Sequence, residues 1–211
     1  NTVASAIEWC WKTFGADIIS LSLGGESDPD ADRNGPTTNA VRQAISNGVF
    51  VISAAGNDGG SDDDGRVSTP SNVVEAISVG AFDDTGEIWK GSSLGESLDT
   101  DGTNREHPHM KPEISAPGVG IISTAYGGEY YSSTGTSDAT VFVAGILALI
   151  LEAEPHIMND TDVDCITEVK LALKESAIPI NPDVEHDPRS GYGAVSGTAW
   201  LDEIRNSGAC L

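Results

Sequence analysis

The feature that most constrains the fold is a short, almost entirely apolar run at residues 49–55, which is followed at once by the turn-forming sequence Gly56-Asn57-Asp58-Gly59-Gly60. A strand without alternation between apolar and polar residues is typical of a parallel sheet that is buried on both faces. Neighbouring parallel strands need long crossover connections, which are usually helices. The run therefore predicts a layered fold in which helices precede and follow this strand.

The flanking sequence alternates between the two patterns. Apolar residues recur at helical spacing from Val3 to Phe14, and Gly15 follows as a stop signal. Pro36 suits the first position of a second helix, which Gly48 closes. Further strands are expected at residues 17–23, 76–81 and 121–124, and further helices at 137–153, 161–177 and 198–205. This alternation, over 211 residues, predicts one α/β domain: a three-layer sandwich with a mainly parallel sheet.

Three of these segments carry more specific expectations. The helix at 137–153 is apolar on every side after its first turn, so we expect it to be buried. Thr161 and Asp164 make a cap signature at the start of the following helix. The polar, turn-rich stretch 99–109 is typical of an inserted surface loop, which would leave His107 and His109 as surface residues or weak metal ligands.

The charge balance limits the classes of partner. Asp and Glu number 33 against 11 Lys and Arg, so the formal net charge is −22. Such a surface repels phosphate groups and anionic lipid headgroups, and we expect neither a nucleic-acid nor a membrane partner. The uninterrupted apolar run at 141–151 is also shorter than the roughly 18 residues of a membrane span.

The spread of the carboxylates along the chain indicates adaptation to concentrated salt, which screens self-repulsion. An ordinary acidic protein from a non-halophilic source is the alternative. We expect an extracellular location, although acidity by itself does not reveal the compartment.

Cysteines and acidic loops leave two questions open. Three cysteines are an odd number, so at least one is unpaired within the chain. Cys10 is expected to be a free thiol, and whether Cys165 pairs with Cys210 stays open. Asp58 and residues 62–64 form a candidate calcium site, for which a solvated acidic loop is the alternative. No other cofactor is implied.

Two segments are placed to carry chemistry, because ligands of open α/β sheets bind at the carboxyl ends of the strands. One is Ala54-Ala55-Gly56-Asn57, at the end of the buried strand, and the other is Gly135-Thr136-Ser137, which opens the apolar helix. A helix N-terminus offers free N–H groups and a positive dipole end that can hold a developing oxyanion. Taken singly, Ser137 is explained as well by an ordinary N-cap, and Gly56-Asn57 by a turn.

The order of several motifs gives these residues a sharper meaning. The chain contains, in sequence, Ser22-Leu23-Gly24-Gly25, Ala54-Ala55-Gly56-Asn57, Lys111-Pro112-Glu113-Ile114-Ser115-Ala116-Pro117-Gly118, Gly135-Thr136-Ser137 with Ala144-Gly145, and Gly191-Tyr192-Gly193-Ala194-Val195. This ordered set resembles the subtilisin-like serine peptidases, the subtilases, over nearly the whole chain. The resemblance implies that residues 1–211 are the C-terminal two-thirds or so of a catalytic domain whose first sheet strands are lacking.

The resemblance also assigns roles to individual residues. Ser137 matches the nucleophile, and Asn57 matches the side-chain donor of the oxyanion hole, beside the N–H of Ser137. Ser22, Leu23 and Gly24 match the backbone edge on which an extended peptide substrate adds as a strand.

Ala54, Ala55 and Gly56 match one wall of the pocket for the residue before the scissile bond, and Ser68 matches the base of that pocket. The bond between Thr69 and Pro70 is a candidate for the cis form.

The chain departs from the family in the residues that activate the serine. A subtilase needs a His to take the serine proton and an Asp to orient that His. Their motifs, Asp-(Ser/Thr)-Gly and His-Gly-Thr-His, are absent, and no histidine of the chain lies in a matching context. We therefore expect the chain by itself to be inactive. It is either part of a working serine endopeptidase or a non-catalytic relative that binds peptides. A nucleotide-binding domain is disfavoured because no phosphate-loop motif is present.

Two further expectations concern the surroundings of the nucleophile. Asp138 stands where the family usually has Met, and we expect its side chain to point away from the oxyanion, toward the leaving-group side or solvent. The strand at residues 17–23 would be an open apolar edge, since the family sheet continues beyond it. Open edges pair with other chains, so we expect either self-association there or a gross rearrangement of the first 30 residues.

Overall fold

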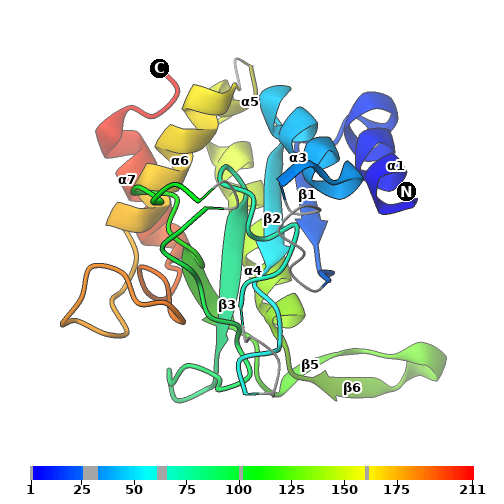
Figure 1. Cartoon of the computed structure of the whole chain (residues 1–211), viewed down its shortest axis with the longest axis vertical. Helices are drawn as coiled ribbons and strands as arrows, with labels where there is room; N and C mark the ends of the chain where they lie inside the picture. Colours follow the sequence, from blue (N-terminus) through cyan, green and yellow to red (C-terminus); the bar gives the residue numbers. More distant parts are fainter. Residues whose placement is uncertain (1, 26–32, 61–65, 100–101, 160–161) are drawn as a thin grey trace.

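The computed structural model describes residues 2–25, 33–60, 66–99, 102–159 and 162–211. Its centre is a sheet of four parallel strands in the order β1, β2, β3, β4, as Figure 1 shows. The strands are β1 (Ile18–Leu21), β2 (Phe50–Ala54), β3 (Ile77–Phe82) and β4 (Ile114–Pro117). All of β2 and almost all of β3 are buried, as the uninterrupted apolar run predicts. The predicted α/β fold with a parallel sheet is confirmed.

Helices cover both faces of this sheet. In Figure 1, α3 (Pro36–Ser46) lies in front of the strands and α4 (Thr136–Ala153) behind them. α4 contacts every strand of the sheet, whereas α1 (Thr2–Trp9) packs on α3. The π-helical turn η1 (Cys10–Phe14) continues α1 and ends at Gly15, which has a left-handed φ of 75°. Pro36 and Gly15 thus begin and end their helices as expected.

The C-terminal helices close one end of the sheet. They are α5 (His156–Asn159), α6 (Val163–Glu175) and α7 (Gly197–Ser207). The side chain of Asp162 caps α6 by accepting from the N–H of Cys165; of the expected cap signature, Thr161 lies outside the described residues. A disulfide joins Cys165 to Cys210 and ties the chain end to α6, while Cys10 is a half-buried free thiol. Trp200 of α7 is fully buried and donates to the carbonyl of Val169.

Residues 121–124 form a strand, β5 (Ile121–Thr124), but not in the main sheet. β5 pairs antiparallel with β6 (Tyr130–Ser133) across the short η2 (Tyr126–Gly128). This hairpin projects from the body of the molecule (Figure 1) and leads directly into α4. Exposed tyrosines lie along it: Tyr126, Tyr130 and Tyr131.

The expectation that α4 is buried on all sides is wrong. Val143, Leu147 and Ile150 face the core, but Val141, Phe142 and Leu149 are exposed, the last at 67%. Composition alone does not separate the two faces, because both are apolar. By length and composition α4 is also sufficient to cross a bilayer; the structure packs it against the sheet with 39% of its residues buried.

The described part of the stretch 99–109 is mostly exposed, as expected of a surface loop, but some of its side chains are anchored in the body of the protein. The Arg105 side chain is 3% exposed and forms an ion pair of 3.1 Å with Asp99. His107 is exposed, as predicted, and bonds the Tyr192 hydroxyl at 2.8 Å. His109 is instead partly buried, and its Nδ1 atom lies 3.0 Å from the Lys170 ammonium.

His109 borders a fully buried polar cluster that joins the sheet to α6. The ammonium groups of Lys111 and Lys170 each lie 2.7 Å from one oxygen of Glu113. The other oxygen of Glu113 accepts from the N–H of Ser78 in β3. Burial lowers the pKa of Lys111 to about 7, while the two ammonium groups hold the pKa of Glu113 below its usual value despite burial. The Glu113 carboxylate thus accepts hydrogen bonds from two buried lysines.

Acid should weaken this cluster through His109. Burial and the neighbouring Lys170 lower the pKa of His109 from 6.5 to about 4, since a protonated ring would face another cation. The unfolded chain then binds more protons than the folded chain between these values. We predict that His109 contributes a loss of unfolding free energy as the pH falls from about 6.5 to about 4.

The substitution His109→Asn tests this, because an Asn oxygen can still accept from Lys170 but does not titrate. Denaturant unfolding across this pH range should show a shallower decline for the variant than for the wild type. Comparison of the two at pH 8 gives the stability difference that is unrelated to titration. Parallel declines in the two proteins would contradict the prediction.

Candidate active site

The first turn of α4 meets the end of β2 through Asn57 and Thr136. The backbone N–H of Thr136 donates to Oδ1 of Asn57 at 2.9 Å, and the Thr136 hydroxyl lies 3.0 Å from the same oxygen. The Thr136 hydroxyl also contacts both the N–H and the carbonyl of Gly56. The sequence predicts that Asn57 and Ser137 lie at one end of the sheet, but it gives no sign that Thr136 joins the two segments.

This contact fixes which way the Asn57 amide faces. A backbone N–H needs an acceptor, so the Asn57 oxygen must face Thr136 and the Nδ2 group must face the other way. Among the residues that the structure describes, nothing accepts from Nδ2 or from the N–H of Ser137. Two donors are therefore available at the start of α4, where the helix dipole also favours negative charge.

Two glycines allow this close approach. A Cβ on Gly118 would lie 2.7 Å from the carbonyl oxygen of Gly135, and the Gly118 carbonyl accepts from the N–H of Gly135 at 2.8 Å. A Cβ on Gly135 would come within 3.2 Å of Nδ2 of Asn57. The small residues of the two motifs thus bring backbone against backbone at the start of α4.

The segment after β1 lies beside Ser137. β1 ends at Leu21, earlier than the predicted strand, and the Ser22 hydroxyl donates to the Ser137 carbonyl at 3.1 Å. Leu23 is 41% exposed, and Gly24 is so close to the Ser68 hydroxyl that a Cβ would clash with it. The N–H of Gly25 donates to the carbonyl of Thr69. These exposed residues form an edge next to the candidate nucleophile.

The predicted pocket residues come together around Ser68. Ser68 is buried, and its N–H donates to the carbonyl of Ala55. Ala54 and Ala55 are buried at the end of β2, and Gly56 has a φ of 116°, which favours glycine. The bond between Thr69 and Pro70 is cis, as expected. The structure thus places Gly24, Ser68 and residues 54–56 in one continuous wall.

Asp138 points toward the hairpin. Its Oδ1 atom accepts a short hydrogen bond from the hydroxyl of Ser133, the last residue of β6. The side chain is therefore held by the hairpin, and no hydrogen bond joins it to Asn57 among the described residues. Sequence reasoning did not identify Ser133 as its partner.

None of the four histidines bonds to Ser137 in the described part of the chain. His107 and His109 contact Tyr192 and Lys170, His156 lies 3.2 Å from the carbonyl of Ala209, and His186 lies 2.8 Å from that of Pro112. The described part of the site thus has a serine hydroxyl and two available N–H donors, and no histidine is bonded to that hydroxyl.

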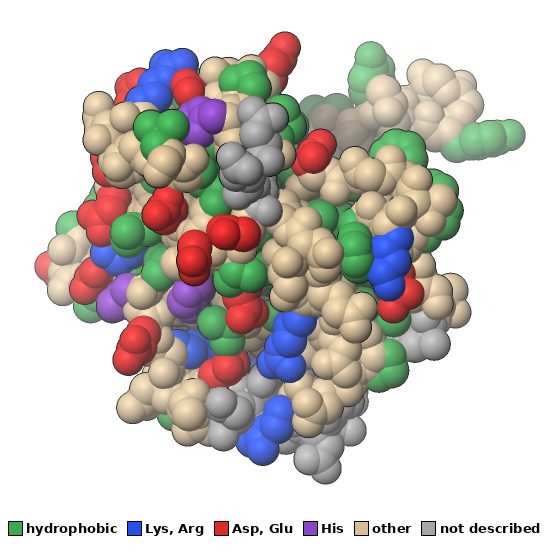
Figure 2. Space-filling model, turned by 90° about the horizontal axis from the view of Figure 1, so that it is seen from above, with side chains coloured by type: hydrophobic (Ala, Val, Ile, Leu, Met, Phe, Trp, Pro, Cys, Tyr) green, Lys and Arg blue, Asp and Glu red, His purple; other side chains and the backbone are tan. Residues whose placement is uncertain are grey.

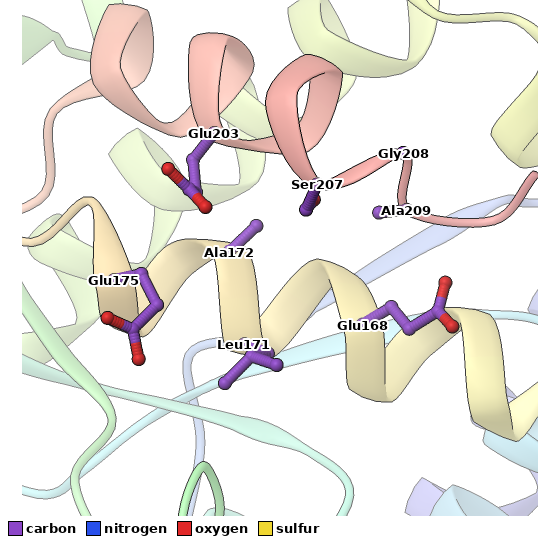
Figure 3. A pocket seen from close by; sticks show the side chains of 8 residues that line it. All are labelled: Glu168, Leu171, Ala172, Glu175, Glu203, Ser207, Gly208 and Ala209. Carbon is purple, nitrogen blue, oxygen red and sulfur yellow. The ribbon is translucent and has the colours of Figure 1, made fainter.

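The candidate calcium site is only partly visible. Residues 62–64 lie outside the described residues, and the described residues contain no group of three or more His, Cys, Asp or Glu side chains that could hold a metal ion. A separate hollow between α6 and α7, shown in Figure 3, shares no residue with the predicted site; it is lined by Glu168, Leu171, Ala172, Glu175, Glu203, Ser207, Gly208 and Ala209.

Solved structures of peptide-maturation proteases share this fold. The Patellamide maturation protease PatA superposes with a TM-score of 0.76 at 28% identity, over 97% of this chain and 68% of that chain. The Prenylagaramide maturation protease PagA gives a TM-score of 0.75 at 29% identity, over 96% and 66% of the two chains.

Sequence comparisons give the same family. Subtilisin amylosacchariticus of Bacillus subtilis subsp. amylosacchariticus is 37% identical over 157 residues, which are 74% of this chain and 36% of that protein. Serine protease AprX of Bacillus subtilis (strain 168) is 33% identical over 216 residues, covering 92% of this chain and 46% of that protein. The chain therefore spans less than half the length of these curated relatives.

A model of the Peptidase_S8 subtilase family matches residues 1–197. This match, together with the identity to AprX over most of the chain, shows that the chain belongs to the subtilase family of serine peptidases.

Proposed function

We propose that the protein is a subtilase-type serine endopeptidase, in which Ser137 is the nucleophile and this chain is the C-terminal part of the catalytic domain. The observation that supports the proposal is that Asn57 bonds the Thr136 N–H directly before Ser137, while Nδ2 of Asn57 and the Ser137 N–H both remain unused. Acyl transfer needs such donors where the carbonyl oxygen of the substrate becomes negative.

The proposed reaction proceeds in two halves. The Ser137 oxygen attacks the peptide carbonyl carbon while a base takes its proton, and the oxyanion forms against Asn57 and the Ser137 N–H. The intermediate collapses to an acyl-enzyme, and the proton passes to the departing amine. Water then repeats the sequence and releases the acid. The base and the carboxylate that orients it would come from motifs that this chain does not contain, so the chain alone is proposed to be inactive.

The same geometry supports a place for the substrate. An extended peptide would pair with the exposed backbone of Ser22, Leu23 and Gly24 beside Ser137. The side chain before the scissile bond would then enter between residues 54–56 and Ser68. The small side chains of this wall leave room for a large apolar group.

A second candidate is a non-catalytic peptide-binding module. The observation in its favour is that every histidine of the chain bonds elsewhere. The coding sequence upstream of Asn1 separates the two candidates. In-frame Asp-(Ser/Thr)-Gly and His-Gly-Thr-His motifs would support the peptidase, and degenerate motifs would favour the binding module.

Covalent labelling tests Ser137 directly. We expect a fluorophosphonate to label the complete gene product and to leave Ser137→Ala unlabelled, because the hydroxyl oxygen forms the bond to phosphorus. Ser132→Ala, which removes an exposed hydroxyl on the neighbouring hairpin, is the matched control and should label normally. Equal labelling of the Ser137 variant and the wild type, measured by intact mass, would refute the assignment.

The oxyanion donor gives a second prediction. Asn57→Ala should lower kcat of the complete enzyme roughly 10²–10³-fold with little change in KM, a magnitude taken over from the corresponding donor of a subtilisin. Because Asn57 also accepts from Thr136, the unfolding midpoint of the variant must be measured alongside. A loss of less than threefold in a folded variant would remove Asn57 from the mechanism.

The sheet edge supports a proposal of self-association. Among the described strands, β1 is paired on one side only, and Val141 and Phe142 are exposed on α4, which contacts β1. We propose that copies of this chain pair through β1 in concentrated salt, where their like charges are screened.

The acidic residues visible in Figure 2 are scattered over the face and do not form one patch. This spread is consistent with a halophilic, extracellular protein, which we also propose.

Sedimentation of the chain in high salt tests this pairing. We expect concentration-dependent dimers or larger species, and we expect Ser20→Lys to shift them toward the monomer, since Ser20 is an exposed position of the edge strand. Thr198→Lys adds the same charge on exposed α7 and serves as the control. A natively folded monomer at all concentrations would contradict the proposal.

A further inference from the structure

The environment of Asp138 bears on which peptides the site accepts. Asp138 directly follows Ser137 in the first turn of α4, is partly exposed, and is held by Ser133 of the hairpin. Its carboxylate therefore has a fixed place immediately beside the nucleophile. A fixed charge at this distance from the reacting bond affects every substrate that binds.

The side of the nucleophile on which Asp138 lies follows from the other contacts. Ser22 and the wall around Ser68 lie on the side of the β1 and β2 ends, and Ser22 bonds the Ser137 carbonyl. The hairpin β5–β6 projects from the body of the molecule and leads into α4 (Figure 1), and its residue Ser133 holds the Asp138 side chain. Because Asp138 bonds the hairpin and not the Ser22 segment, a peptide whose acyl part pairs with Ser22 to Gly24 would carry its leaving part toward Asp138.

No basic side chain of the surrounding sequence neutralises this carboxylate. From residue 112 to residue 169 the chain contains neither Lys nor Arg, and this range includes the whole hairpin and all of α4. Glu129 adds a second acid to the hairpin, and the exposed rings of Tyr130 and Tyr131 offer faces on which a guanidinium can stack. A cation must therefore come from solvent or from the substrate.

We propose that Asp138 makes the leaving-group side of the site selective for Arg or Lys in the residue after the scissile bond. The inference rests on the proposed peptidase function and adds a specificity to it. The cation would also serve catalysis, because the Asp138 charge opposes the oxyanion that forms beside it and a bound cation offsets this opposition. Asp138 and Glu129 would repel a substrate with Glu at this position. Such a substrate would also supply no cation to offset the effect of Asp138 on the oxyanion.

Matched peptides test the selectivity in the complete gene product. Internally quenched substrates that differ only in the residue after the scissile bond carry Arg, Leu or Glu at that position. At the lowest salt concentration that preserves the fold, we expect kcat/KM for Arg to exceed that for Glu about fivefold or more, as for a partly exposed ion pair. This ratio should shrink as salt is added.

Asp138→Asn removes the charge but keeps an oxygen that accepts from Ser133. The ratio of Arg to Glu should fall toward one in this variant, and the Leu substrate should be cleaved at least as well as by the wild type. Asp202→Asn removes the same charge from an exposed position on α7 and should keep the wild-type ratio. If the ratio of kcat/KM for the Arg and Glu substrates fell toward one in both variants, the effect would be one of general charge, and the assignment to Asp138 would be overturned.

Binding keeps the inference testable without cleavage. In the Ser137→Ala background, fluorescence anisotropy with the same peptides should show tighter binding of the Arg peptide than of the Glu peptide, and Asp138→Asn should abolish the difference. Cleavage with equal rates for all three peptides would overturn the inference and leave the peptidase intact. Absence of both cleavage and binding would overturn the proposed function as well.

Discussion

The contact between Asn57 and the Thr136 N–H is the interaction on which the site depends. It joins the end of a buried strand to the beginning of a helix that touches all four strands of the sheet. The Asn57 oxygen is occupied by this contact, and the Nδ2 group consequently faces away from Thr136 and is free to donate. The same interaction thus fixes the helix start and orients the side chain that is proposed to be the oxyanion donor. A side chain at position 118 would collide with the Gly135 carbonyl, and one at position 135 would press on the Asn57 amide.

Most of the fold could be predicted from apolar patterning, and the failures have physical causes. Strands β2 and β3 follow from their uninterrupted apolar runs. The rule that ligands of open α/β sheets bind at the carboxyl ends of the strands predicts that Asn57 and Ser137 lie at the same end of the sheet. β4 was missed because prolines bracket it, and β6 because its tyrosines and serines are exposed and carry no burial pattern. The exposed side of α4 could not be predicted, since its composition is as apolar as the buried side.

The polar interior was hidden from sequence reasoning for a different reason. Considered singly, a charged residue such as Lys111, Lys170 or Arg105 would be predicted to lie at the surface. Its burial requires a partner that lies elsewhere in the sequence. Glu113 is that partner for both lysines, and α6 supplies Lys170 from 57 residues further along the chain. A buried charge group of this kind is weak evidence of stability, since desolvation opposes the attraction. What it fixes is the position of α6 against the sheet, because only one arrangement satisfies all its members.

This use of basic residues also changes the meaning of the net charge. Lys111, Lys170 and the Arg105 side chain are all buried, so three of the 11 Lys and Arg contribute no exposed positive charge. The surface that solvent and substrates meet is correspondingly more acidic than composition suggests. In concentrated salt this long-range field is screened within a few ångströms. A carboxylate in direct contact with a substrate is screened less than this field, so the selectivity proposed for Asp138 should weaken with salt more slowly than the effects of distant surface charges.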